Sequence, residues 1–407
     1  MSSRIRRVAG GVCAAKGFRA AGVPAQIKYK GRNDVALIVA DAPCAAAAVF
    51  TTNAVAAAPV VYDRQVVKGG RIQAILANSG CANACTGAAG FGDAERSAIE
   101  TARTLGIDPK LVLVASTGVI GHRLPMDRLL AGMKAAAGQL AATPEAGLAA
   151  EKAVMTTDTK PKQAAVCVTI GGKAVTVGGM CKGSGMIEPN MATMLGFITT
   201  DAAIAPAMLR RALRRAIALS FNHVVVDGDE STNDSVFVLA SGAAGNKPIV
   251  AAGADFELFV EALTAVGVAL AKQMAADGEG ATKFVTVTVK GARSPRDAER
   301  AARAIAKSPL AKTSWFGKDP NWGRVLAAAG YSGAEVDDRK AEVFYGKTWA
   351  YRKGKVADEA QLKKLAKELE GPELTVTVNL HLGDFAATIY TCDFSLDYVH
   401  INADYTT

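Results

Sequence analysis

The segment Lys182-Gly-Ser-Gly-Met-Ile-Glu-Pro-Asn-Met-Ala-Thr-Met-Leu-Gly-Phe-Ile-Thr-Thr200 lies near the middle of the 407-residue chain. Its first half is polar and contains Gly183, Gly185 and Pro189, which are typical of a sharply bent loop. Its second half becomes apolar directly after Thr193. This change predicts a loop that presents the Thr193 hydroxyl at the beginning of a buried strand.

The composition is that of a globular protein, with 50% hydrophobic and 21% charged residues. No stretch approaches the roughly 18 to 20 apolar residues of a membrane span. The net charge of +9 is spread along the chain, and aromatic residues make up only 6% of it. The positive charge is therefore better explained by small acidic substrates or by solubility than by binding of nucleic acid. Seven scattered cysteines indicate reduced thiols and a cytoplasmic location, and four distant histidines give no metal-ligand spacing.

Short apolar runs and amphipathic stretches alternate along the chain and predict an α+β fold. We expect strands at 35–39, 45–51 and 60–62, a hairpin around Gly171-Gly172, and a long helix at 256–276. The texture of the sequence changes after residue 280. We therefore place a catalytic domain at 1–280 and a smaller α/β lobe at 281–407.

A threonine hydroxyl is a poor nucleophile unless a base lies beside it. A free α-amino group, with a pKa of about 7.7 to 8.0, would be such a base, and freeing it requires breaking the Ala192–Thr193 bond. The residues alone leave this hypothesis open beside an ordinary structural threonine. Cys81 or Cys85 as nucleophile is less favoured because no histidine is near in sequence, and a phosphate-binding loop fails because Ser184 stands where lysine is required.

The segment resembles the self-cleavage motif of the ornithine acetyltransferase family, also called the glutamate N-acetyltransferase family. Further blocks resemble the family in the same order along nearly the whole chain: 50–54 (FTTNA), 78–87 (NSGCANACTG), 116–121 (STGVIG), 155–159 (MTTDT), 226–234 (VDGDESTND), 277–283 (DGEGATK) and 319–324 (DPNWGR). The chain departs from the usual pattern at Gln26, Cys81 and Glu188. The resemblance implies a layered, N-terminal-nucleophile-like domain.

The resemblance also assigns roles to individual residues. It implies that Thr193 is the nucleophile, with its freed amine as base, and that Thr117 and Gly118 form the oxyanion hole. It implies substrate contacts from a second group of residues: Thr156, Lys182, Thr193, Glu279, Asn402 and Thr407. Thr157 is close behind Thr156 as a candidate for the same contact.

The implied activity is acetyl transfer from N2-acetyl-L-ornithine to L-glutamate in arginine biosynthesis, through an acetyl-threonine intermediate. The chain is expected to cleave itself into an alpha chain, residues 1–192, and a beta chain that begins at Thr193. The resemblance implies no metal and no organic cofactor, and an assembly of two such pairs into a heterotetramer. Some members also take the acetyl group from acetyl-CoA, and the sequence does not settle that use here.

Two rival interpretations are kept for testing. One is a related self-processing aminopeptidase or amidohydrolase, in which water replaces glutamate as acceptor. The other is a non-enzymatic anion-binding protein with an intact glycine-rich loop. The acidic segment at 227–234 departs from the spacing of a calcium loop, and we interpret it as a polar turn packed near the core.

Overall fold

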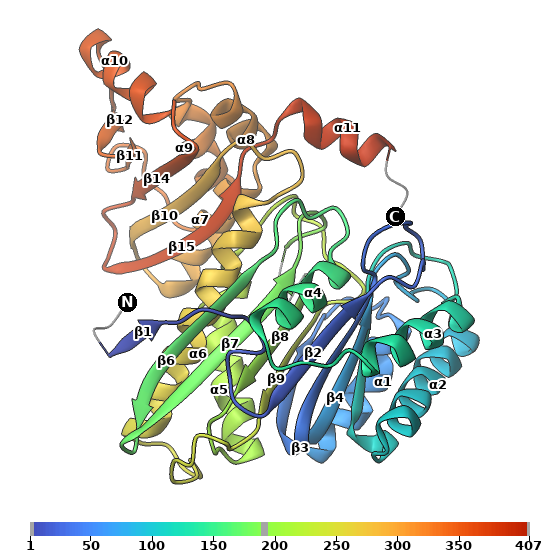
Figure 1. Cartoon of the computed structure of the whole chain (residues 1–407). Helices are drawn as coiled ribbons and strands as arrows, with labels where there is room; N and C mark the ends of the chain where they lie inside the picture. Colours follow the sequence, from blue (N-terminus) through green and yellow to red (C-terminus); the bar gives the residue numbers. More distant parts are fainter. Residues whose placement is uncertain (1–3, 189–193, 405–407) are drawn as a thin grey trace.

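The computed structural model describes residues 4–188 and 194–404, and these residues form two β-sheets with their helices (Figure 1). Within the described residues, the larger sheet has nine strands in the order β1-β6-β7-β8-β9-β3-β4-β5, with β2 paired to β3. Its strands are β1 (Ile5–Arg7), β2 (Phe18–Val23), β3 (Val35–Phe50), β4 (Arg71–Asn78), β5 (Val112–Ser116), β6 (Gln163–Ile170), β7 (Lys173–Lys182), β8 (Leu195–Thr200) and β9 (Ser235–Ala240).

Six helices of the described residues accompany this sheet. They are α1 (Ala58–Val66), α2 (Gly87–Leu105), α3 (Met126–Ala137), α4 (Pro144–Val154), α5 (Pro206–Ala218) and α6 (Ala254–Ala276). Their ends follow ordinary capping chemistry. Thr143 accepts a hydrogen bond from the Ala146 amide ahead of Pro144, and Gly106 ends α2 with a φ of 68°.

The long strand β3 joins two halves of the large sheet, one containing β2, β4 and β5 and the other containing β6–β9. The two halves face each other. The first part of β3 pairs with β2 and β4, and its second part pairs with β9. Ile38 and Ile75 of one half pack in the same buried cluster as Phe197 and Phe237 of the other half. The two half-sheets therefore share an apolar interior, which the stacked rings of Phe197 and Phe237 help to fill.

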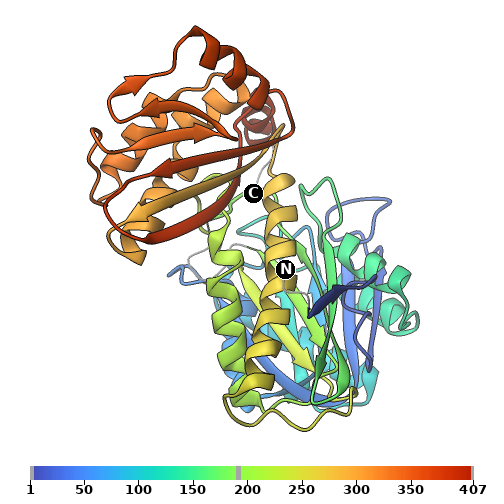
Figure 2. The ribbon, with the colours of Figure 1, turned by 90° about the vertical axis from the view of Figure 1, so that its left-hand side faces the viewer.

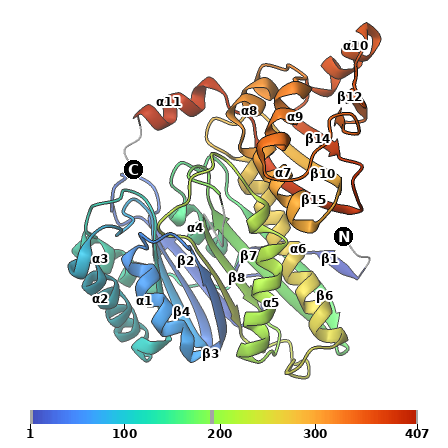
Figure 3. The ribbon, with the colours of Figure 1, turned by 180° about the vertical axis from the view of Figure 1, so that it is seen from behind.

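Helices cover the outer faces of both half-sheets. The outer face of β6–β9 packs against α5 and α6, and that of β2–β5 packs against α1, α2 and α3 (Figure 3). The result is four layers in the order helix, sheet, sheet, helix. This arrangement confirms the predicted α+β class and its layered, N-terminal-nucleophile-like domain.

Some of the predicted strands and helices are confirmed and others are wrong. The hairpin is confirmed, with Gly171 and Gly172 both at positive φ between β6 and β7, and so is the long helix, which runs within α6. The strand at 60–62 was wrong, because these residues lie in α1, which has a proline in its first turn. The strands at 35–39 and 45–51 are one strand, whose register against β4 shifts between Val39 and Cys44.

The smaller sheet lies beyond the end of α6 and carries its own helices (Figure 2). Its strands are β10 (Phe284–Ala292), β11 (Glu342–Tyr345), β12 (Thr348–Arg352), β13 (Lys355–Val356), β14 (Glu373–Asn379) and β15 (Phe385–Cys392). Its helices are α7 (Pro295–Lys307), α8 (Pro309–Phe316), α9 (Trp322–Tyr331) and α10 (Glu359–Glu368). The chain then leaves this lobe as α11 (Leu396–Asp404), which returns toward the large domain. The division at residue 280 stays a prediction.

None of the helices in the described ranges has the length and apolarity needed to cross a membrane.

The contact between β2 and α4 gives a test of the layered packing. A methyl group on Gly22 would lie 1.9 Å from the Ala149 carbonyl oxygen, so Gly22→Ala should lower the free energy of unfolding by about 1–3 kcal/mol. Gly92→Ala is the matched control, because nothing lies within 4 Å of its added methyl group and alanine favours the helix. Urea unfolding followed by circular dichroism measures both, and equal stability of the two variants would contradict this close approach.

Candidate functional site

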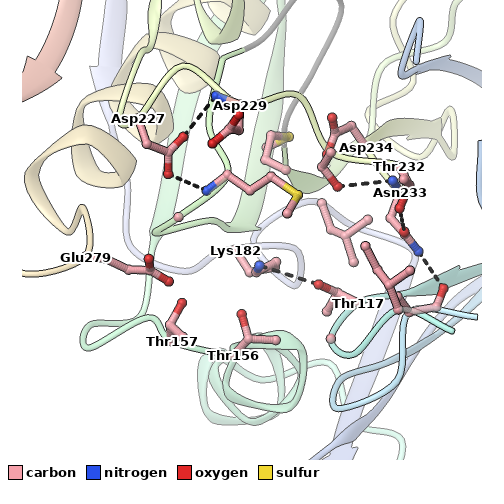
Figure 4. Close-up of a pocket in the computed structure, with 18 of the residues that line it drawn as sticks. Thr117, Thr156, Thr157, Lys182, Asp227, Asp229, Thr232, Asn233, Asp234 and Glu279 are labelled. Atoms are coloured by element: carbon pink, nitrogen blue, oxygen red, sulfur yellow. Dashed lines mark hydrogen bonds between the residues drawn. The ribbon is translucent and has the colours of Figure 1, made fainter. Parts of the chain in front are cut away.

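A pocket opens where the ends of several strands of the large sheet meet the segment after α6 and the helix α11 (Figure 4). Lys182 ends β7, Leu195 begins β8, and Asp234 directly precedes β9. The remaining lining residues come from other loops and from α11: Ala82, Thr117, Gly118, Ile120, Thr156, Thr157, Gly185, Met186, Met194, Asp227, Asp229, Ser231, Thr232, Asn233, Glu279, Tyr398 and Asn402.

The pocket gathers the predicted site residues that the structure describes. Those residues are Thr117, Gly118, Thr156, Lys182, Glu279 and Asn402, and Thr157 lies with them. Ala192, Thr193 and Thr407 lie outside the described residues. Met194, which follows Thr193 in the chain, lines the pocket.

Lys182 and Thr117 meet on one wall of the pocket. The Lys182 ammonium donates to the Thr117 hydroxyl at 3.5 Å, and the lysine is 9% exposed. Gly118 beside it has a φ of +128°, and a Cβ there would lie 2.4 Å from the carbonyl carbon of Gly80. Only glycine fits this turn, which explains the Thr-Gly pair at the end of β5.

Glu279 lies on another wall and is held by two contacts. Its backbone amide donates to the Ser184 carbonyl at 3.0 Å, and its carboxylate accepts a hydrogen bond from the Asn402 side chain at 2.9 Å. A Cβ on Gly185 would lie 2.3 Å from the Glu279 carboxyl carbon, so the absence of a side chain at Gly185 makes room for this acid. Helix α11 thus supplies part of the pocket through Asn402.

A buried ion network lies beneath the loop that begins at Lys182. The Lys162 ammonium bonds Asp158 at 2.7 Å and Asp277 at 2.5 Å, and all three side chains are at most 4% exposed. Asp158 also accepts from the Gly183 amide at 2.7 Å. Burial raises the pKa of the Asp158 carboxyl, but the charges of Lys182 and Lys162 together with these hydrogen bonds outweigh it and bring the pKa to about 2.

The acidic segment at 227–234 is a polar turn packed near the core, as predicted, and it also forms one side of the pocket, which the sequence did not indicate. Asp227, Asp229 and Asp234 all line the pocket. The Asp227 carboxylate accepts hydrogen bonds from the amides of Met186 at 2.6 Å and Ile187 at 2.8 Å, which fixes the loop after Lys182. The signal that would have found these acids is the parallel pairing of β8 with β9, because it places the residues before both strands side by side.

Asn233 joins this acidic segment to two other loops. Its side-chain amide donates to the carbonyls of Ala82 at 2.6 Å and Ser116 at 2.8 Å. The buried Asn233 therefore holds the end of β5, and with it Thr117, against the beginning of β9.

The cysteine and metal alternatives find little support here. Cys81 is 4% exposed, and burial raises the pKa of its thiol, which disfavours the reactive thiolate. Among the described residues, no group of three or more histidine, cysteine or acidic side chains is placed to hold a metal ion.

Comparisons with a family model and with individual proteins all match this chain to the same family. Residues 19–407 match the model of the ArgJ family. The arginine biosynthesis bifunctional protein ArgJ of Symbiobacterium thermophilum is 54% identical over 98% of this chain and 99% of the relative. The protein of the same name from Geobacter sulfurreducens is 51% identical over 96% of this chain and 99% of its own.

Two solved structures show similar sequences over about half of this chain. The arginine biosynthesis bifunctional protein argJ of Bacillus halodurans is 42% identical, with a TM-score of 0.45, over 47% of this chain and 100% of that chain. The ornithine acetyltransferase of Mycobacterium tuberculosis, complexed with ornithine, is 45% identical, with a TM-score of 0.43, over 46% of this chain and 100% of that chain.

The buried ion network predicts a large effect of removing its single cation. Lys162→Met would leave Asp158 and Asp277 buried without their countercharge, and should lower the free energy of unfolding by about 3–5 kcal/mol. Lys160→Met, which changes an exposed lysine two residues away, is the control and should change stability little. A Lys162→Met protein with the urea midpoint of the control would contradict this account of the network.

Proposed function

This chain belongs to the ArgJ family of arginine biosynthesis acetyltransferases, and from this premise we propose that it moves the acetyl group of N2-acetyl-L-ornithine to L-glutamate. One observation carries the proposal. Thr117, Gly118, Lys182, Glu279 and Asn402, which come from distant parts of the chain, line a single pocket together with Met194, the neighbour of Thr193. A relative with 45% identity is described as an ornithine acetyltransferase complexed with ornithine.

The reactive group in this proposal arises by self-cleavage of the Ala192–Thr193 bond. The chain would separate into residues 1–192 and 193–407, which stay together because β7 and β8, one from each piece, are neighbours in the same sheet. Cleavage frees the α-amine of Thr193. That amine then takes the proton of the Thr193 hydroxyl, which becomes the nucleophile.

Acetyl transfer then follows in two halves. The Thr193 oxygen attacks the acetyl carbonyl of acetylornithine, the C–N bond breaks, and the leaving ornithine amine receives the proton. The amine of glutamate attacks the resulting ester, which releases acetylglutamate and restores the hydroxyl. The Thr117 amide already donates to the Asn78 carbonyl at 3.0 Å, so the oxyanion hole would use the Thr117 hydroxyl and the Gly118 amide.

The charges of the pocket suit an amino acid that carries both signs. Lys182 would bind the substrate carboxylate, and Glu279 would bind the side-chain ammonium of ornithine. Asn402, Thr156 and Thr407 would add hydrogen bonds. The proposal extends to a heterotetramer of two cleaved pairs, to a cytoplasmic location, and to acetyl-CoA as a second acetyl donor; native mass spectrometry and an acetyl-CoA assay test the first and the last.

The cleavage step predicts a missing peptide bond in the purified protein. Intact-mass measurement should find two fragments, one beginning at Thr193, in place of a single 42.0 kDa chain. Thr193→Ala should leave one uncut and inactive chain because it removes the hydroxyl. Thr169→Ala, at an exposed position of β6, should be cut like the natural chain, and a Thr193→Ala chain that is still cut would contradict the nucleophile.

The same preparation separates the proposal from its hydrolase rival. With acetylornithine and glutamate supplied together, acetylglutamate should be the main product. Release of mostly free acetate would show that water is the acceptor and would contradict the transferase assignment.

Glu279 should contribute to the recognition of ornithine. Glu279→Gln removes the negative charge but keeps the size, so the KM for acetylornithine should rise about 10- to 100-fold, as expected for a hydrogen bond between charged groups. Glu230→Gln, in a neighbouring exposed acid that does not line the pocket, is the control. An unchanged KM in Glu279→Gln would assign the ammonium to another acid.

A further inference from the structure

In the proposed self-cleavage, no group has yet been assigned to accept the proton of the Thr193 hydroxyl. The α-amine of Thr193 acts as base only after the Ala192–Thr193 bond is broken. During cleavage that nitrogen is part of a peptide bond and has no basicity to offer. A second group must therefore handle the proton of the Thr193 hydroxyl in this first step, and the following inference rests on the proposed function.

Among the described lining residues, four acids are candidates, and their surroundings differ. Asp229 is exposed at the rim, and Asp227 accepts hydrogen bonds from three backbone amides, those of Met186, Ile187 and Asp229. Glu279 accepts a hydrogen bond from Asn402. The fourth acid, Asp234, is 2% exposed, and its Oδ2 atom has no hydrogen-bond partner within the described part of the chain.

Asp234 is also the acid that the sheet places beside Met194, the residue that follows Thr193 in the chain. The amide of Ser235 donates to the Met194 carbonyl at 2.9 Å, and Ser235 is paired with Leu195 in the parallel register of β8 and β9. Met194 and Asp234 both line the pocket. In Figure 4 Asp234 lies on the side of the pocket that carries Thr117, and Glu279 lies on the other side.

We propose that the Asp234 carboxyl transfers the proton in self-cleavage. The Thr193 Oγ1 atom attacks the Ala192 carbonyl carbon, and its proton passes to Asp234. The C–N bond then breaks, and Asp234 returns the proton to the departing Thr193 nitrogen, which becomes the free amine. Water hydrolyses the ester that remains: its oxygen bonds the Ala192 carbonyl carbon, the bond to Oγ1 breaks, and a water proton restores the hydroxyl.

The environment of Asp234 fits a group that both accepts and donates a proton. Burial raises the pKa of its carboxyl well above the usual value, although hydrogen bonds from the Ser231 hydroxyl and the Met194 amide, together with the charge of Lys182, lower it. A carboxyl with a raised pKa protonates readily in the course of a reaction near neutral pH. An ordinary exposed aspartate would be a weaker proton acceptor.

The test follows the disappearance of the intact chain from the moment it is made. The full chain is synthesised by cell-free translation, translation is stopped, and the intact 42.0 kDa species is measured over time by mass spectrometry. Asp234→Asn should cleave at least about 100-fold more slowly than the natural chain, the size of effect typical for general acid–base catalysis. Asp384→Asn makes the same chemical change at an exposed position of the smaller lobe and should cleave at the natural rate.

The outcomes separate this inference from the proposed function. If the natural chain itself stays intact, the self-cleavage proposal fails and Asp234 is not at issue. If the natural chain is cut and Asp234→Asn is cut within a few-fold of its rate, the role of Asp234 is overturned.

A folding defect is told apart by a second variant and a second readout. Asp234→Asn should melt within a few degrees of the uncut Thr193→Ala chain. If it melts lower, Asp234→Ala decides: added formate should restore at least a tenth of the natural cleavage rate, and chloride at equal ionic strength should not. A folded Asp234→Ala chain without formate rescue would count against proton transfer by this residue.

Discussion

The site depends on a buried ammonium that is shared by two carboxylates. Asp158 and Lys162 lie on the connection between α4 and β6, and Asp277 directly follows α6, so two segments distant in sequence meet at one charge. Removing these charges from water costs free energy, and the arrangement is stable only because the remaining lone pairs are also satisfied. Asp158 accepts from the Gly183 amide, and Asp277 accepts from the Thr159 amide at 3.0 Å. The network thereby fixes the backbone of Gly183, directly after Lys182, and that of Thr159.

The position of the pocket follows from how the large sheet is connected. Strands β8 and β9 are parallel neighbours, so the residues before them lie side by side although about 40 positions separate them in sequence. Asn233 connects this edge to the end of β5, which carries Thr117 and Gly118. The loops that line the pocket are thus held by the sheet and by buried polar contacts, which suits a site that must keep a fixed geometry.

The sequence predicted the chemistry of the pocket better than its local structure. The Thr193 segment, the Thr-Gly pair and Lys182 were found because each motif is short and contiguous. The strand at 60–62 was wrong because Val60, Val61 and Tyr62 fit a strand and a helix equally well, and only packing against α2 and β5 selects the helix. The acids at 227–234 were missed because their role depends on strand pairing, which no local pattern records.

The electrostatics of the pocket bear on how one site would accept both ornithine and glutamate. Four acids line it in the described part of the chain, and Lys182 is the lysine that faces them. If all four were ionised, the carboxylates of glutamate would meet strong repulsion. Burial raises the pKa of Asp227 and of Asp234, which lowers the free-energy cost of protonating either acid when a second carboxylate enters the pocket. Glu279 would then face the ammonium of ornithine, and Lys182 stays available to a carboxylate. Burial of two acids would therefore let a single pocket bind substrates whose side chains carry opposite charges.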